Sequence, residues 1–256
     1  MSPRVLVRGH LLDVPGNPFT GAAGLRSEPD GAILIEGDRI TARGAAAGLL
    51  ADAPDATVVD HRGAFLLPGF IDTHVHFPQL PVIGSMGLPL LRWLAERTLP
   101  AEAALDTAAS ASQAADRFLR ALAKNGTTSA LVFGSHLPIA QNAFFERAAA
   151  SGMRIASGLS LGDRELPDAL VRHADDCYRE SEALIARWHG NGFLRYAVTP
   201  RFSVSCSEAV LDACGALKQR YPGVMIQTHI NENRDEISLV CSQFPWARDY
   251  FDTYER

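Results

Sequence analysis

Two histidines separated by one residue, His74 and His76, end an apolar stretch and are the clearest candidates for chemistry in this chain. Successive side chains of a strand point to opposite faces, so residues two positions apart lie on the same face. If residues 66–76 form a strand, both imidazoles can therefore bind one cation. A second apolar stretch ends at His229, and Glu232 follows three residues later. Three histidines at the ends of two strands would supply most of a metal site.

The same residues can also be interpreted without a function. Paired histidines can be satisfied side chains of a core, and Glu232 can be a carboxylate that the dipole at a helix N-terminus favours. We prefer the metal site because an H-x-H pair and a third histidine occupy equivalent places at the ends of apolar stretches. His136 follows another such stretch and is equally well interpreted as a pocket residue or as a supporting or surface histidine. Trp93 is expected to pack rather than to bind a ligand.

The composition is that of an ordinary globular protein that can bury a core. Of 256 residues, 47% are hydrophobic and 21% are charged, and the formal net charge is −5. This charge argues against binding to nucleic acid or to an anionic membrane. We find no apolar stretch of membrane-spanning length and no N-terminal secretion signal, and we expect a cytoplasmic protein. The cysteines form no C-x-x-C pair and are expected to be reduced: Cys177, Cys206, Cys214 and Cys241.

The chain divides into two regions of different pattern. Residues 1–65 contain short apolar strands and turns, and they are expected to form part of a small β-sandwich domain. Residues 66–256 alternate between strands and helices, which indicates a parallel sheet with helices outside it. The expected strands are residues 66–76, 127–133, 154–160, 194–199 and 224–229. The expected helices are residues 88–97, 101–124, 138–150, 167–189 and 207–220.

The positions of the polar residues favour a (β/α) barrel over a doubly wound sheet. In such a barrel the chemistry collects at the carboxyl ends of the strands. His74 and His76 end the first expected strand, Arg201 follows the fourth, and His229 ends the fifth. A glycine-rich dinucleotide turn, which the doubly wound alternative would favour, does not follow an early strand. The fold class is therefore α/β, a TIM-like barrel of which about five strands are present, with a small β-rich N-terminal domain.

Several motifs resemble a known family. The stretch LPGFIDTHVH at 67–76 is similar to the opening barrel strand of the amidohydrolase superfamily. Longer pieces resemble the guanine deaminases within it, and they occur in that family's order. These pieces are HFPQ at 76–79, LLRWL at 90–94, PAE at 100–102, TPRFS at 199–203 and HINENRDE at 229–236.

The resemblance implies a mononuclear zinc site with His74, His76 and His229 as ligands and one zinc ion per chain. Zinc suits neutral imidazoles and lowers the pKa of a bound water. Glu232 would then carry protons between water and substrate. Binuclear members of the superfamily have a bridging lysine on the fourth strand, and residues 194–199 contain none.

The resemblance also implies a small-molecule purine substrate, gripped by Gln79, Arg201 and Phe202, with guanine converted to xanthine and ammonia. It implies a homodimer for the complete enzyme. A fourth histidine and an aspartate of the family's site are expected beyond residue 256, since an eight-stranded barrel needs about 250 residues for itself. The alternatives are a deaminase of another purine, a pterin or a triazine, or a non-catalytic fragment that acts as an interaction module.

Overall fold

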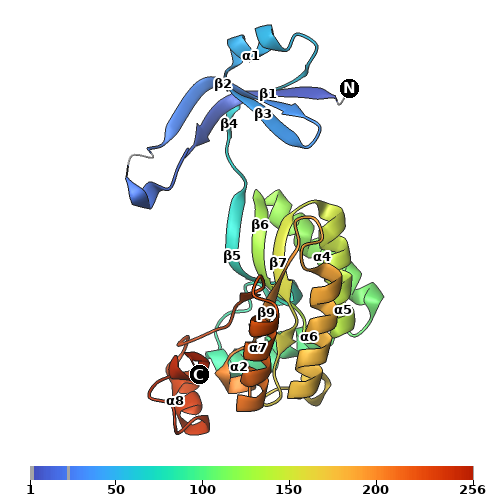
Figure 1. Ribbon diagram of the computed structural model, residues 1–256, viewed down its shortest axis with the longest axis vertical. Helices are drawn as coiled ribbons and strands as arrows, with labels where there is room; N and C mark the ends of the chain where they lie inside the picture. Colours follow the sequence, from blue (N-terminus) through green and yellow to red (C-terminus); the bar gives the residue numbers. More distant parts are fainter. Residues whose placement is uncertain (1–2, 22–23, 256) are drawn as a thin grey trace. The chain divides into compact units, whose positions relative to one another are not determined.

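The structure is a computed structural model that describes residues 3–21 and 24–255. It contains two compact units, Met1–Gly69 and Phe70–Arg256. The division therefore falls after Gly69, whereas the sequence placed it after residue 65. The difference arises because the last strand of the first unit, β4, runs to Leu66 (Figure 1).

The first unit is a four-stranded sheet of order β3-β2-β1-β4. β1 pairs antiparallel with β2 and parallel with β4. Leu6, Leu34 and Ala46 lie in its small core. The elements are β1 (Arg4–Asp13), η1 (Pro18–Thr20), β2 (Arg26–Glu36), β3 (Arg39–Ala45), α1 (Ala46–Asp52) and β4 (Thr57–Leu66).

The second unit is a parallel sheet whose strand order, β5-β6-β7-β9-β10, follows the order along the chain, while β8 pairs with β9. A doubly wound sheet would reverse direction at a switch point. An order that never reverses, with the long helices along one side of the sheet (Figure 1), is that of a barrel wall. The strands are β5 (Phe70–His76), β6 (Thr127–Phe133), β7 (Arg154–Gly158), β8 (Ser160–Leu161), β9 (Arg195–Pro200) and β10 (Met225–Ile226).

Helices and helical turns connect these strands. The Thr107 hydroxyl accepts from the Ser110 N–H and begins α4, and Gly152 ends α5 at φ 70°, a left-handed conformation that glycine tolerates. The elements are η2 (Phe77–Val82), α2 (Leu90–Trp93), the π-helical turn η3 (Leu94–Thr98), α3 (Leu99–Ala103), α4 (Ala108–Lys124), α5 (Pro138–Ser151), η4 (Asp168–Leu170), α6 (Ala174–Trp188), η5 (Ser203–Ser205), α7 (Glu208–Arg220), α8 (Arg234–Gln243) and α9 (Asp252–Glu255).

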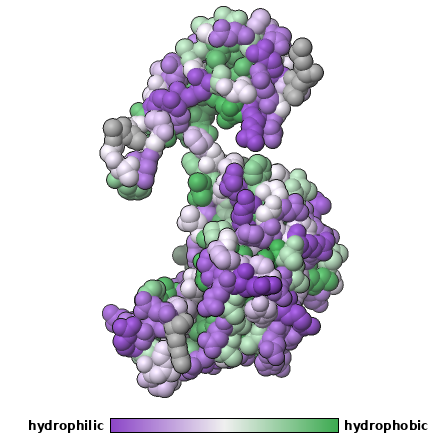
Figure 2. Space-filling view, in the orientation of Figure 1, coloured by the Kyte–Doolittle hydropathy of each residue, from purple (hydrophilic) through white to green (hydrophobic). Residues whose placement is uncertain are grey.

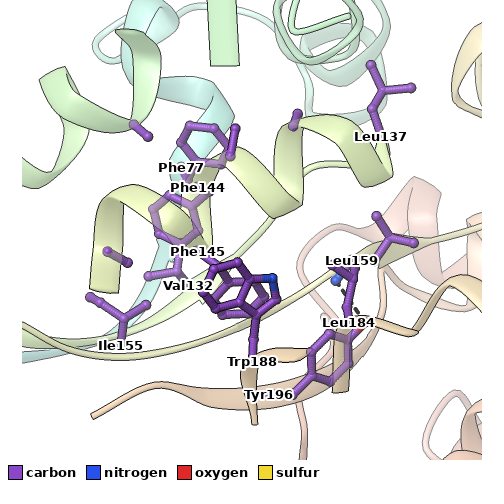
Figure 3. Close-up of a cluster of buried hydrophobic side chains, with 14 of the residues drawn as sticks. Phe77, Val132, Leu137, Phe144, Phe145, Ile155, Leu159, Leu184, Trp188 and Tyr196 are labelled. Atoms are coloured by element: carbon purple, nitrogen blue, oxygen red, sulfur yellow. Dashed lines mark hydrogen bonds between the residues drawn. The ribbon is translucent and has the colours of Figure 1, made fainter. Parts of the chain in front are cut away.

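The main core lies between the sheet and its helices. Phe77 and Phe144 stack with ring centroids 4.6 Å apart, and Phe145 stacks on Trp188 at 5.8 Å (Figure 3). Such aromatic pairs dominate the burial that holds helices to a sheet. Polar side chains prevail on the face of this unit in Figure 2. None of the helices in residues 3–21 and 24–255 has the length and apolar character needed to cross a membrane.

Several element boundaries differ from those expected. The strand expected at 66–76 begins only at Phe70. The strand expected at 154–160 ends at Gly158. A Cβ added at Gly158 would lie 1.7 Å from the Ala197 carbonyl oxygen, so only a glycine allows β7 and β9 to approach this closely. The helix expected at 167–189 begins at Ala174. The first two expected helices are redivided as α2–η3–α3 and α4, because the Thr107 cap starts a new helix.

The strand expected at 224–229 is also shorter, since β10 covers Met225–Ile226. The chain nevertheless continues along β9. The Gln227 N–H donates to the Val198 carbonyl at 3.0 Å, and the His229 N–H donates to the Arg201 carbonyl at 3.2 Å. His229 therefore lies in a loop beyond β10 and is held beside the end of β9.

Candidate metal centre

The structure brings His74, His76 and His229 together, with one ring nitrogen of each within 4.8 Å of the others. Nε2 of His76 and Nε2 of His229 are 3.0 Å apart. The first two side chains come from the end of β5, and the third from the loop after β10. This grouping crosses 153 residues of sequence.

Phe133, the last residue of β6, forms the floor of this cluster. Its ring centroid lies 4.9, 4.6 and 4.1 Å from those of His74, His76 and His229. Phe133 is 1% exposed, so it keeps water from that side of the histidines. Sequence reasoning missed this residue, although its place at the carboxyl end of an expected strand was a usable signal.

Two of the three imidazoles, those of His76 and His229, are held in their neutral form. Burial lowers the pKa of His229 to about 4, and the charge of Arg201 contributes in the same direction. Burial, then the charges of Arg201 and His229, lower the pKa of His76 well below its ordinary value. Nδ1 of His229 donates to the Arg201 carbonyl at 2.7 Å, which leaves the lone pair on Nε2. A ring held in this way is typical of a metal ligand.

The donor set fits a divalent transition metal. Zinc takes tetrahedral nitrogen ligands at about 2.0–2.1 Å, which places ligand nitrogens roughly 3.3–3.4 Å apart. The observed range, from 3.0 Å to within 4.8 Å, brackets this separation. Small rotations of the side chains therefore suffice to place three imidazole nitrogens around one ion.

A buried polar network lies beside the histidines. Glu102 is 1% exposed, Arg201 is 2% exposed and His136 is fully buried. Nη1 of Arg201 donates to both carboxylate oxygens of Glu102, at 2.8 and 3.1 Å. Nε2 of His136 lies 3.2 Å from Glu102 Oε2 and 3.1 Å from Arg201 Nη1. Nε2 of Gln79 donates to Glu102 Oε1 at 2.9 Å.

Glu102 is negatively charged in this network. Burial by itself would raise the pKa of its carboxyl, but the Arg201 guanidinium and the hydrogen bonds from His136 and Gln79 lower the pKa well below its usual range. The sequence assigned no role to Glu102, and it did not decide whether His136 lines the pocket or is a supporting or surface histidine. The structure places His136 inside this network, with Nδ1 buried and without a hydrogen-bond partner among the described residues.

One cavity adjoins the histidine cluster, and a second adjoins Arg201. The larger has a volume of about 550 Å³ and is lined by His74, His76, Gln79 and Trp93, among others. Trp93 thus faces a cavity, where the sequence suggested packing alone. A second cavity, of about 120 Å³, is lined by Arg201 and by residues that include Phe202. Phe202 is 4% exposed and its ring centroid lies 6.4 Å from that of His229.

Glu232 lies in the turn between His229 and α8. Asn231 adopts φ 59°, a left-handed conformation that turns the chain. The backbone N–H groups of Glu232 and Asn233 donate to Glu236 Oε2 at 2.8 and 2.9 Å, and so fix the start of α8. Partial burial and the charge of Glu236 raise the pKa of Glu232, while Arg201 opposes the rise. Its carboxylate is therefore a better base than an ordinary glutamate.

Tyr254, from the aromatic C-terminal stretch, holds the His229 loop. Its hydroxyl donates to the His229 carbonyl at 2.9 Å, and it accepts from the Ser203 N–H at 2.8 Å and from the Thr228 hydroxyl at 3.1 Å. One donor and two acceptor sites are all that a tyrosine hydroxyl offers. Nearby, Asp252 pairs with Arg248.

A barrel wall with a histidine cluster at its strand ends is the arrangement of metal-dependent (β/α)-barrel hydrolases. Residues 65–250 match the amidohydrolase family, and the chain belongs to that family. Its fold is the barrel of that family together with a small β-rich N-terminal sheet.

Three relatives show a closer likeness. A probable guanine deaminase of Deinococcus radiodurans is 50% identical over 98% of this chain and 58% of its own length. The guanine deaminase structure from Bradyrhizobium japonicum superposes with a TM-score of 0.93 at 35% identity, over 99% of this chain and 56% of its own. The guanine deaminase from C. acetobutylicum, with guanine bound in its active site, gives 0.86 at 25% identity over 98% and 59%. The chain thus spans somewhat more than half the length of these relatives.

Proposed function

We propose that this chain carries the metal-binding and purine-binding part of a zinc-dependent guanine deaminase, which converts guanine and water to xanthine and ammonia. The observation that carries the proposal is the meeting of three imidazoles, from β5 and the loop after β10, on the floor formed by Phe133. The comparisons support the proposal because the similar proteins are named guanine deaminases.

The metal in the proposal is one zinc ion per chain, held by His74, His76 and His229. Nitrogen donors of this kind suit zinc better than calcium or magnesium, which prefer oxygen. When bound, zinc would lower the pKa of a water molecule towards about 7 and so supply a nucleophile at neutral pH. Burial contributes by keeping His76 and His229 unprotonated.

Glu232 is the proposed proton carrier. A carboxylate with a raised pKa accepts a proton from water readily, and it also releases that proton to a ring nitrogen of the purine. The same group can then help the amino group leave as ammonia. The hydrogen bonds from its own backbone N–H and from that of Asn233 to Glu236 fix the turn that carries Glu232, three residues after the ligand His229.

Gln79, Arg201 and Phe202 are the proposed purine contacts. Gln79 lines the cavity that the histidines share, and Arg201 reaches the same network through Glu102. An arginine offers donors only, whereas an amide offers both a donor and an acceptor, so the two together can read a lactam edge. Assembly as a homodimer stays a prediction from the resemblance, and a cytoplasmic location stays a prediction from the sequence pattern.

The test is a substrate panel on the intact protein, purified with zinc. Ammonia release is measured with guanine, adenine, cytosine and a pterin, and metal content is measured by elemental analysis. We expect a clear preference for guanine and about one zinc per chain. His229→Ala should lose most of the zinc, while His61→Ala, an exposed histidine of the first unit, should keep it.

Other results would contradict the proposal. A preference for another base would replace guanine as the substrate. Zinc content that is unaffected by His229→Ala would show that the metal site is assigned wrongly. Release of no ammonia from any base would favour the interaction-module alternative.

A further inference from the structure

Glu102 is a buried carboxylate without a role in the chemistry described above. It sits in α3, is 1% exposed, and is contacted by Gln79, Arg201 and His136. Two of these are the proposed purine contacts, although they come from η2 and from the end of β9. One acidic side chain thus joins them across sequence distances of 23 and 99 residues.

The carboxylate determines which way the Gln79 amide faces. An ionised carboxylate only accepts hydrogen bonds, so the amide must direct its nitrogen to Glu102. The same nitrogen is also 3.2 Å from Nδ1 of His76. The amide oxygen has no hydrogen-bond partner among the residues described, and Gln79 lines the large cavity. The group left for a ligand is therefore an acceptor.

Glu102 also determines which nitrogens of Arg201 are engaged in hydrogen bonds. Within the described part of the chain, the hydrogen bonds of this side chain all leave from Nη1, towards Glu102 and His136. Nε and Nη2 have no partner among the described residues and are the groups of Arg201 left for a ligand, although Arg201 lines the smaller cavity and Gln79 the larger. The negative charge of Glu102 also compensates the positive charge of a side chain that is 2% exposed. Without that compensation, a buried guanidinium would be drawn towards water.

We propose that Glu102 is a positioning residue, which orients the Gln79 amide oxygen and the free N–H groups of Arg201 for the purine. The pair then presents one acceptor and a set of donors, which matches a lactam edge with its adjacent N–H and C=O. This inference rests on the proposed function, because it assumes that the ligand is guanine. A base without the lactam, such as 2-aminopurine, would meet donors where it has no oxygen to accept them.

The experiment compares Glu102→Gln with Glu102→Asp in the intact, zinc-loaded protein. The glutamine keeps the shape but can donate as well as accept, so Gln79 is no longer forced into one orientation. We expect kcat/KM for guanine to fall by about 10²-fold, mainly through KM, with zinc content unchanged. The preference for guanine over 2-aminopurine should shrink at least tenfold. Glu102→Asp keeps an acceptor-only group and should recover part of that preference.

The matched control is Glu96→Gln. Glu96 lies six residues away in the preceding helical turn and pairs with Arg92 at 2.8 Å on the surface. This variant should leave kcat/KM unchanged for both guanine and 2-aminopurine. A purely structural role for Glu102 would lower kcat/KM for the two bases equally, and that result would overturn the proposal, as would normal kinetics in Glu102→Gln.

A melting experiment separates this inference from the proposed function. If Glu102 holds Arg201, the fall in Tm of Glu102→Gln combined with Arg201→Gln should be smaller than the sum of the two single falls. Additive falls would refute the positioning role. A parent protein that does not deaminate guanine would refute the proposed function, and non-additive melting would still support the orientation of Arg201 by Glu102.

Discussion

Replacement of Tyr254 by phenylalanine should loosen the loop that carries His229. The substitution removes one oxygen atom and leaves three groups without their partner: the His229 carbonyl, the Ser203 N–H and the Thr228 hydroxyl. Ser203 is fully buried, so water cannot easily replace the lost bond. The ring itself can remain in place, stacked near Tyr250 at 6.0 Å.

The expected size follows from these three bonds. A net contribution of about 1 kcal/mol for each hydrogen bond gives a loss of roughly 3 kcal/mol in the free energy of unfolding. For a unit of this size, about 2–4 °C of Tm corresponds to each kcal/mol, so the Tm should fall by roughly 6–12 °C. The His229 carbonyl is among the freed groups, and zinc affinity should therefore fall by about tenfold.

The assay is thermal unfolding together with zinc titration of the intact protein. Tyr221→Phe is the matched control, because its hydroxyl donates to Glu182 at 2.8 Å and, among the residues that the structure describes, forms no hydrogen bond to the His229 loop. That variant should lose at most about 1 kcal/mol and keep its zinc affinity. If Tyr254→Phe melts like Tyr221→Phe, or binds zinc as tightly as the parent, Tyr254 does not hold the His229 loop.

Two further perturbations test the electrostatics of the site. In zinc-free protein, burial lowers the pKa of His229 to about 4, so the unfolded chain binds protons below about pH 6.5 and the folded one does not. The free energy of unfolding should therefore be highest above pH 6.5 and fall by up to roughly 3 kcal/mol between pH 6.5 and 4. Urea unfolding at several pH values should show this dependence. If a His229→Asn variant shows the same dependence, His229 is not its source. Glu232→Gln keeps the hydrogen-bonding shape but cannot accept a proton, so it should bind zinc and lose about 10²-fold or more in kcat. Near-normal ammonia release by that variant would remove Glu232 from the mechanism.

Local stereochemistry made much of this protein predictable. The two-residue period of a strand places His74 and His76 on one face, and the alternation of strands and helices indicates a parallel sheet. Strand ends gather at one edge of such a sheet, which is why His229 could be paired with residues far away along the chain. The motif resemblance added zinc and the purine, and the match to the amidohydrolase family supports that class.

Other features depended on the packing of distant segments. Glu102 meets Arg201 across 99 residues, and Tyr254 meets Ser203 across 51. A glutamate in a helix or a tyrosine in an irregular stretch carries no local sign of its partner, because the contact is determined by how the helices fold back on the sheet. The length of β10 also depends on packing. Its regular pairing with β9 ends at Ile226, although hydrogen bonds from the following loop to the end of β9 continue. Periodicity along the chain thus predicts which face a side chain occupies, whereas burial, charge compensation and hydrogen-bond partners arise only when the segments pack together.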